Sequence, residues 1–204
     1  TRMIMINSPH NPTGSIISAE DMQRLGEILR GTDILVLSDE VYEHLIYDDN
    51  IHQSVAKFPE LAQRSFVVGS FGKTFHATGW KMGFVLAPEN LMAEFRKAHQ
   101  WVVFTVNTPI QYALADYLSE PKNYLTLGSF YQKKRDYFLR KIKKSRFKIV
   151  PSSGTYFQVL DYSDISDEGG MDFAVRMIKE FGMASIPLSP FYQDKTETHR
   201  LRFC

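Results

Sequence analysis

Three short segments combine polar or charged side chains with turn-forming residues, and each follows an apolar run that predicts a strand. The segments are Asn7–Gly14, Ser38–Tyr42 and Gly69–Thr74. Open α/β sheets bind ligands at the carboxyl ends of their strands, so we expect an amide, an acid, a phenol and a lysine to meet in one crevice. Each side chain has a simpler explanation alone, as a turn, a helix cap, a core residue or a surface charge. Their placement at successive strand ends favours a binding site for a small molecule.

The elements that must position these segments predict an α/β fold. Four apolar runs predict buried strands, at Met3–Ile6, Ile34–Leu37, Phe66–Val68 and Phe84–Leu86. Between the first two, Ser18 can cap a helix with Asp21 three residues on, and Gly31 can end it. A strand, a helix and a strand at this spacing predict a βαβ unit. We therefore expect a mostly parallel sheet with helices on both faces.

The rest of the chain predicts long helices followed by a smaller α+β domain. Residues 89–119 predict a helix broken by Pro109, and residues 123–145 predict a second helix. Beyond residue 146 the pattern predicts strands at 147–150, 155–160, 184–188 and 200–203 around a helix at 171–181, which ends at Gly182. We divide the chain into 1–122, part of a large domain, and 123–204, a connecting helix with a small C-terminal domain truncated at its end.

Both ends of the chain lie inside an apolar or alternating run. Met3–Ile6 opens the chain almost at once, and Arg200–Phe203 closes it without a turn signal. Natural termini usually lie beyond the last element of a fold, so this pattern indicates a fragment of a longer protein. The alternative is a pair of short edge strands at natural ends.

Composition and charge exclude several classes of protein. The chain has 204 residues, of which 44% are hydrophobic and 23% charged, with a formal net charge of +1. This composition excludes disordered and collagen-like chains and gives no argument for nucleic acid or a membrane surface as a partner. The basic residues between 133 and 148 are interpreted as the solvated face of a helix. Cys204 is the only cysteine, which excludes an internal disulfide framework, and no apolar run approaches the ~18 residues of a membrane span. We expect a cytoplasmic protein.

Several motifs for nucleotide binding, nucleophilic catalysis and metal binding are incomplete or absent in this sequence. Gly72-Lys73-Thr74 is similar to the end of a P-loop, but Val67 stands where the first glycine is needed. No Gly-x-Gly-x-x-Gly loop is present, and Val68 replaces the first glycine of a nucleophile elbow around Ser70. No two histidines have His-x-x-x-His spacing, so we expect no metal site.

The segments that remain resemble the fold-type I, pyridoxal-phosphate-dependent aminotransferases of class I/II. Asn11-Pro12-Thr13-Gly14, Ser38-Asp39-Glu40-Val41-Tyr42 and Ser70-x-x-Lys73 occur in the family's order and approximate spacing. The resemblance covers essentially all of the chain and is strongest to the methionine, kynurenine and glutamine aminotransferases. It implies that residues 1–122 are part of the large domain that binds pyridoxal 5′-phosphate. It also implies α-amino acid and 2-oxo acid substrates and a homodimer.

The resemblance assigns a role to each side chain near the cofactor ring. Lys73 corresponds to the lysine that binds the cofactor aldehyde and then moves a proton. Asp39 corresponds to the carboxylate that keeps the pyridine nitrogen protonated, because a charge-assisted hydrogen bond favours the charged form. Tyr42 and Asn11 correspond to the two donors to the phenolic oxygen of the cofactor.

Further residues correspond to the phosphate and substrate contacts. Ser70 and Lys81 match phosphate-binding positions, and Arg202, with Asn11, matches the site for the substrate α-carboxylate. Many family members have arginine where Lys81 stands, but lysine still neutralises a phosphate. The family's phosphate loop and its stacking aromatic residue precede Asn11 and are not found in this sequence.

Two alternatives to transamination stay open from the sequence. A carbon–sulfur β-lyase would use the same lysine on the same fold. A silent aminotransferase-like module of a transcription regulator would carry a DNA-binding domain upstream. We also predict that the 204 residues by themselves are inactive, because only Ser70 and Lys81 are identified as phosphate contacts.

Overall fold

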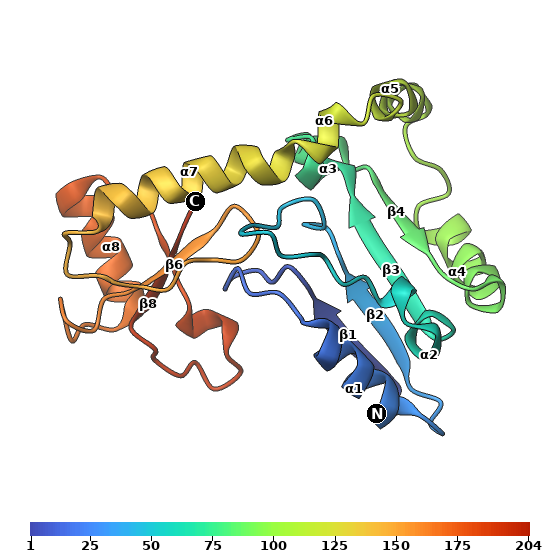
Figure 1. The fold of residues 1–204 in the computed structure, drawn as a ribbon, viewed down its shortest axis with the longest axis horizontal. Helices are drawn as coiled ribbons and strands as arrows, with labels where there is room; N and C mark the ends of the chain where they lie inside the picture. The colour runs from blue at the N-terminus through green and yellow to red at the C-terminus, as the bar shows by residue number, and fades with distance from the viewer.

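The apolar runs near the N-terminus form one four-stranded sheet in a computed structural model, which describes all residues 1–204 (Figure 1). Its strands lie in the order β1-β2-β3-β4. Their bounds are β1 Met3–Asn7, β2 Leu35–Asp39, β3 Ser65–Ser70 and β4 Gly83–Leu86. The first three pair in parallel, whereas β4 is antiparallel to β3. The expected mostly parallel sheet is confirmed.

Helix α1 (Ala19–Leu29) has the start and end that the sequence predicts. Ser18 Oγ accepts a hydrogen bond from Asp21 N at 3.1 Å, and Gly31 follows the helix with φ of +73°. Helix α1 and the short α2 (Pro59–Ala62) cover one face of the sheet. The core between them consists of Met22, Leu29, Val36, Val55, Leu61 and Val67.

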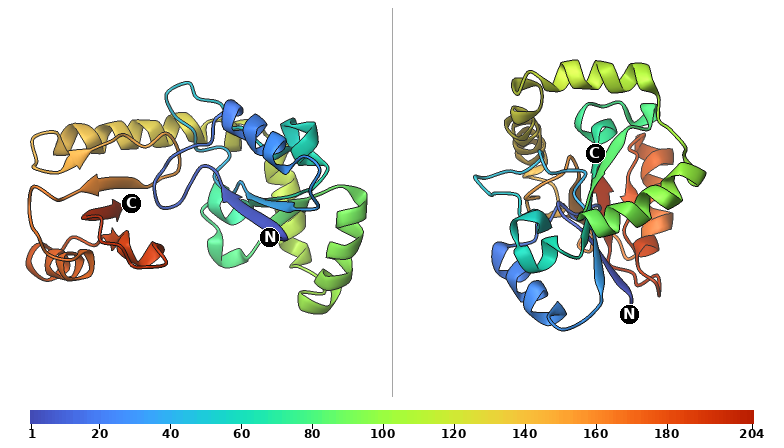
Figure 2. Two further views of the ribbon diagram at one scale, coloured as in Figure 1. Left: turned by 90° about the horizontal axis from the view of Figure 1, so that it is seen from below. Right: turned by 90° about the vertical axis from the view of Figure 1, so that its right-hand side faces the viewer.

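The opposite face of this sheet is covered unevenly. Phe66 of β3 packs on Phe95 of α4, with ring centroids 6.3 Å apart. At β1, however, the Met5 side chain on that face is 73% exposed. Figure 2 shows α4 and α5 on the side of the sheet away from α1. Helices thus lie on both faces, but the second layer leaves β1 open.

The helical region after β4 is divided differently from the prediction. It contains α4 (Glu89–Val102) and α5 (Thr108–Leu118), and the break between them lies at 103–107 rather than at Pro109. Pro109 lies in the first turn of α5, where its missing N–H costs nothing. The predicted helix at 123–145 is two helices, α6 (Lys122–Leu125) and α7 (Leu127–Ile142).

The C-terminal strands form a second, antiparallel sheet in the order β5-β6-β8-β7. Their bounds are β5 Lys148–Ile149, β6 Gln158–Asp161, β7 Ile186–Pro187 and β8 Arg200–Phe203. Helix α8 (Gly170–Phe181) packs Phe173 and Met177 against Tyr162 and Leu201, and it ends at Gly182 with φ of +65°. The strands predicted at 155–160 and 184–188 are shorter than expected.

The short β6 has a physical reason, because the residues just before it pair with the first half of the chain. Thr155 N donates to Leu45 O at 3.0 Å, and Ser153 N and Gly154 N both donate to Gly14 O at 2.9 Å. A Cβ on Gly14 would lie 2.5 Å from Ser152 Cβ, so the two loops approach as only glycine allows. These contacts hold the two sheets in one arrangement.

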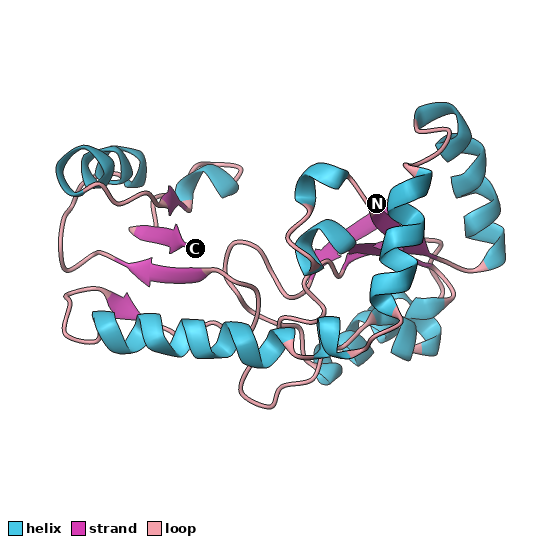
Figure 3. Ribbon diagram, turned by 90° about the horizontal axis from the view of Figure 1, so that it is seen from above, coloured by secondary structure: helices cyan, strands magenta, loops and turns pink.

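Helix α7 also joins the two sheets, running from the first to the second (Figure 3). Its Arg135 side chain is 7% exposed and contacts both Asp48 oxygens, at 2.6 and 2.7 Å, and Ser152 O at 2.6 Å.

The remaining elements are the short α3 (Phe71–Thr74) and three 3-10 helices, at Val55–Lys57, Thr78–Trp80 and Ser189–Phe191. None of the helices has the length and apolar character that crossing a membrane requires.

Candidate functional site

The three motif segments lie side by side at the carboxyl ends of the parallel strands. Asn7 of β1 is in register with Asp39 of β2, and Ser8 N donates to Asp39 O at 3.1 Å. Glu40 N donates to Val68 O of β3 at 2.9 Å, which continues the ladder past the end of β2. The expectation that these segments share one edge of the sheet is therefore met by the strand register.

Asn11 and Arg202 are brought together across the two sheets. Arg202 Nη1 donates to Asn11 Oδ1 at 2.6 Å, although 191 positions separate the two residues. Asn11 is held by its backbone, since Asn11 N donates to Asn7 Oδ1 at 2.8 Å. The Arg202 guanidinium lies 4.1 Å from the centroid of the Phe157 ring, which supports it by a cation–π contact. The Asn11 Nδ2 donor has no partner within the protein.

Asp39 is half-buried and uses one carboxylate oxygen locally. Val41 N donates to Asp39 Oδ1 at 3.2 Å, which fixes the carboxylate at the start of the turn after β2. The Oδ2 atom makes no hydrogen bond within the protein. Asp39 can therefore accept a further hydrogen bond from a ligand at this edge of the sheet.

Tyr42 is 2% exposed and lies edge-on to two other rings. Its ring centroid is 5.4 Å from that of Tyr156 and 6.0 Å from that of Phe157. Burial raises the pKa of the Tyr42 phenol well above its usual value; Tyr156 and the negative charge of Asp39 add to the rise, and Arg202 opposes it. The phenol consequently stays protonated at neutral pH and can donate a hydrogen bond.

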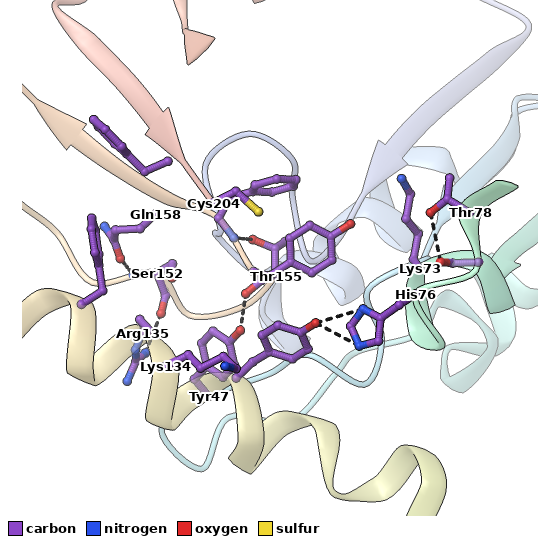
Figure 4. A pocket seen from close by; sticks show the side chains of 16 residues that line it. Tyr47, Lys73, His76, Thr78, Lys134, Arg135, Ser152, Thr155, Gln158 and Cys204 are labelled. Atoms are coloured by element: carbon purple, nitrogen blue, oxygen red, sulfur yellow. Dashed lines mark hydrogen bonds between the residues drawn. The ribbon is translucent and has the colours of Figure 1, made fainter. Parts of the chain in front are cut away.

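Lys73 follows β3 within the short helix α3 and is half-buried. Its amine forms no ion pair and no hydrogen bond within the protein. It lines a pocket of about 360 Å³ together with His76, Tyr131 and Tyr156. Figure 4 shows Lys73 and His76 on one side of this pocket and Thr155 on the other.

Of the predicted site residues, this pocket is lined by Lys73 alone. Most of its remaining lining comes from α7, from the loop before β6 and from the end of the chain, including Arg135, Phe138, Phe203 and Cys204. Asn11, Asp39 and Arg202 do not line it. The convergent polar groups at the strand ends, rather than this pocket, therefore define the candidate site.

Ser70 and Lys81 are brought close by the antiparallel pairing of β3 and β4. Ser70 is in register with Gly83, and Gly72 N donates to Met82 O at 3.4 Å, so the loop between the strands folds back on α3. Lys81 is exposed, with φ of +57° and ψ of +43°. The Ser70 hydroxyl and the Lys81 amine make no hydrogen bond within the protein. Both are available to an anion.

The chemistry of this donor set fits pyridoxal 5′-phosphate. Lys73 offers an unpaired amine for an aldehyde, and Asp39 offers a free carboxylate oxygen for a ring N–H. Tyr42 and Asn11 offer O–H and N–H donors for a ring oxygen. Ser70 and Lys81 offer a hydroxyl and a positive charge for a phosphate. The residues of this chain thus match the functional groups of the cofactor in type.

The structure adds two aromatic residues to this neighbourhood that the sequence reasoning missed. Tyr156 and Phe157 contact each other at a centroid distance of 4.7 Å, and both contact Tyr42. In the sequence they belonged to a predicted strand. No local signal distinguishes an aromatic residue of a strand from one that faces a site on another sheet.

The chain is similar to aminotransferases of known name over its whole length. It is 44% identical over 205 residues to the methionine aminotransferase of Escherichia coli, covering 100% of this chain and 53% of that protein. It is 33% identical over 226 residues to human kynurenine–oxoglutarate transaminase 1, covering 100% of this chain and 54% of that protein. The chain thus spans about half the length of these relatives.

Solved structures and a family model agree with these relatives. The crystal structure of the E. coli methionine aminotransferase YbdL matches with a TM-score of 0.98 at 44% identity, covering 100% of this chain and 54% of that one. N-Succinyldiaminopimelate aminotransferase from Mycobacterium tuberculosis matches with a TM-score of 0.93 at 33% identity, covering 100% of this chain and 53% of that one. The model of the family "Aminotransferase class I and II" matches residues 1–204. Aminotransferases of this kind depend on pyridoxal 5′-phosphate. The chain belongs to the class I and II aminotransferase family.

Proposed function

We propose that the natural protein carrying this chain moves an amino group from an α-amino acid to a 2-oxo acid with the help of pyridoxal 5′-phosphate. The names of the relatives support a donor with a methionine-like or aromatic side chain, and the sequence resemblance adds a glutamine-like one. The aromatic rings of Tyr42, Tyr156 and Phe157 beside the site favour an apolar or aromatic side chain. The 2-oxo acid acceptor shares the α-carboxylate of the donor and is proposed to use the same contacts.

The contact between Arg202 and Asn11 carries this proposal. A guanidinium presents five N–H donors in a plane and binds a carboxylate through two of them. Arg202 spends one donor on Asn11 Oδ1 and lies over the Phe157 ring, so its orientation is held while other donors stay free. Because Arg202 is half-buried, its attraction to a carboxylate is stronger than in bulk water.

Asp39, Tyr42 and Asn11 are the residues that would hold the ring of the cofactor. Asp39 Oδ2, left free by the bond from Val41 N to Oδ1, would accept a hydrogen bond from the pyridine N–H and would keep the proton there. Tyr42 and the free Nδ2 of Asn11 would donate to the ring oxygen. Asn11 Oδ1 accepts from Arg202, and its Nδ2 would donate to the cofactor, so this amide would link the substrate carboxylate to the ring.

Lys73 is the residue that would move the proton. When bound, pyridoxal 5′-phosphate supplies an aldehyde for covalent attachment and a conjugated ring that takes up an electron pair. Lys73 Nζ has no competing ion pair or hydrogen bond within the protein, so its amine would be free to take up a proton and return it nearby. Ser70 and Lys81 would hold the phosphate, which would keep the reacting end of the cofactor within reach of Lys73.

Reductive labelling of the natural gene product tests the role of Lys73. Borohydride treatment in the presence of pyridoxal 5′-phosphate should leave a pyridoxyl group on the peptide that contains Lys73. Lys73→Ala should lose both the label and transamination. Lys97→Ala is the matched control, because Lys97 is exposed and pairs only with Glu94 at 2.6 Å. A label that persists on another lysine in Lys73→Ala would refute the assignment.

We further propose that the natural protein is a homodimer. The segment at the end of α4 exposes several large apolar side chains: Trp101 is 84%, Val102 82% and Phe104 81% exposed. Exposed apolar patches of this kind are typical of protein interfaces. Light scattering of the natural protein should give twice the mass of one chain, and Trp101→Glu should lower it to one.

A further inference from the structure

Glu40 is a buried carboxylate between Asp39 and the turn that carries Tyr42, and no step proposed above uses it. Glu40 is 2% exposed. Its Oε1 accepts from Ser38 Oγ at 2.8 Å and from Val55 N at 3.1 Å. Its Oε2 lies 2.7 Å from His52 Nε2. A buried carboxylate requires such hydrogen-bond partners, and both oxygens of Glu40 have them.

Alternation along β2 places Glu40 and Asp39 on opposite faces of the sheet. Val36, Ser38 and Glu40 are buried toward the core below α1 and α2, whereas Asp39 lies on the other face. The backbone of Glu40 belongs both to the ladder with β3, through Glu40 N to Val68 O, and to the following turn. Anchoring the Glu40 side chain therefore fixes the backbone from which the Asp39 carboxylate projects.

His52 completes the anchor from a separate loop. Its side chain is 14% exposed, and its Nδ1 has no hydrogen-bond partner within the protein, so the contact to Glu40 is the only polar contact of the ring. Because Glu40 can only accept, His52 carries a proton on Nε2 and donates it. Burial by itself raises the pKa of Glu40, but the bonds from His52 and Ser38 outweigh it and hold that pKa below its usual value.

We infer that Glu40 and His52 form a positioning pair that sets the orientation of Asp39 and Tyr42 toward the pyridoxal 5′-phosphate ring. This inference rests on the proposed function of Asp39. Neither residue of the pair touches the cofactor; both act through the backbone at the end of β2. A role in folding alone would make Glu40 and His52 matter for stability and leave the folded enzyme unchanged.

The test uses Glu40→Gln in the natural gene product. Glutamine has the same shape, and its Oε1 can still accept from Ser38 and Val55, but its amide N–H₂ faces the His52 N–H. We expect kcat to fall about 10-fold, as small misplacements of a site group do, while KM for the amino donor stays within about twofold. The visible absorption of bound pyridoxal 5′-phosphate should titrate at a shifted pH, in the same direction as in Asp39→Asn.

Glu43→Gln and two His52 variants provide the controls. Glu43 is a neighbouring half-buried residue whose carboxylate has an ion-pair contact with His44, at 3.7 Å, and makes no side-chain hydrogen bond within the protein. Glu43→Gln should leave kcat and the spectral titration unchanged. His52→Ala should reproduce the effect of Glu40→Gln, and His52→Gln, whose amide can still donate to Glu40, should restore much of kcat. These His52 variants decide the question if Glu40→Gln does not fold.

The outcomes separate the inference from the function on which it rests. If Asp39→Asn shifts the spectral titration and Glu40→Gln and His52→Ala lower only the melting temperature, the positioning role is overturned and the proposed function stands. If Asp39→Asn itself leaves the spectrum and kcat unchanged, the proposed role of Asp39 fails and the inference fails with it. A shared spectral shift with rescue by His52→Gln supports the pair.

Discussion

Lys81 combines a strained backbone conformation with a proposed role in phosphate binding, and replacing it with glycine and with alanine should separate the two effects. Lys81 has φ of +57° and ψ of +43°, in the left-handed region. For a residue with a Cβ this region costs about 1–2 kcal/mol. Glycine removes that cost but loses about 0.5–1 kcal/mol through the greater freedom of the unfolded chain. The balance predicts that Lys81→Gly stabilises the fold by roughly 0.5–1 kcal/mol.

The same substitution should weaken binding of pyridoxal 5′-phosphate. Lys81 is exposed and makes no hydrogen bond within the protein, so its charge is available to the phosphate but partly screened by solvent. Loss of a screened contact of about 1 kcal/mol corresponds to a rise of about fivefold in the dissociation constant. Lys81→Gly should thus be more stable as apoprotein and bind the cofactor less tightly.

Lys81→Ala is the control that separates backbone from charge. It removes the amine but keeps the Cβ, so it should bind the cofactor as weakly as Lys81→Gly without the gain in stability. Differential scanning calorimetry of the apoproteins should place Lys81→Gly about 2 °C above Lys81→Ala. Equal melting temperatures would refute the argument from backbone strain, and unchanged cofactor affinity in both variants would remove Lys81 from the phosphate site.

Three further substitutions test other parts of the structure. Arg202→Lys should raise KM for amino acids and 2-oxo acids alike, by about 10-fold or more, because lysine cannot bind a carboxylate in the planar bidentate geometry; steady-state kinetics with unchanged KM for both would contradict this. Leu61→Ala, at a 0% exposed core position, should lower the free energy of unfolding by about 2–5 kcal/mol in urea titration, and a loss below about 1 kcal/mol would indicate a loose core. Arg135 lowers the pKa of Asp48 from its usual 3.8, so this pair stabilises the fold above about pH 4 and the contribution disappears as pH falls through the lowered pKa. Because the Asp48 side chain is 49% exposed, Asp48→Asn should cost at most about 1 kcal/mol at pH 7, and the two unfolding curves should converge in acid; a gap that widens below pH 4 would reverse the sign of the argument.

Local patterns determined most of the secondary structure and the edge of the sheet where the motif segments meet. The cap at Ser18, the stop at Gly31 and the alternation of β2 involve residues within a few positions of one another. Such signals lie entirely in the sequence, because hydrogen bonds of caps and the alternation of strands are local. They placed Asp39 and Ser70 at the ends of neighbouring strands, and the register of the sheet agrees.

Boundaries that depend on distant partners were predicted less well. The helical break lies at 103–107 rather than at Pro109, because proline is tolerated in a first turn and Asn107 caps the new helix, its Oδ1 accepting from Ile110 N at 3.2 Å. Residues 155–157 do not extend β6, since Thr155 N pairs with Leu45 O instead. A β-propensity pattern does not show which partner a backbone N–H will find.

The sequence by itself determined the residue types at this site and the strand ends that carry them, because both are properties of short segments. Only the tertiary structure decided that Arg202 Nη1 meets Asn11 Oδ1, that Tyr42 is buried against Tyr156, and that Glu40 is anchored to His52. Each of these contacts depends on how separate elements pack against one another. Arg202 reaches Asn11 across 191 positions because the loop before β6 is hydrogen-bonded to Gly14 and Leu45, and no local pattern encodes that closure.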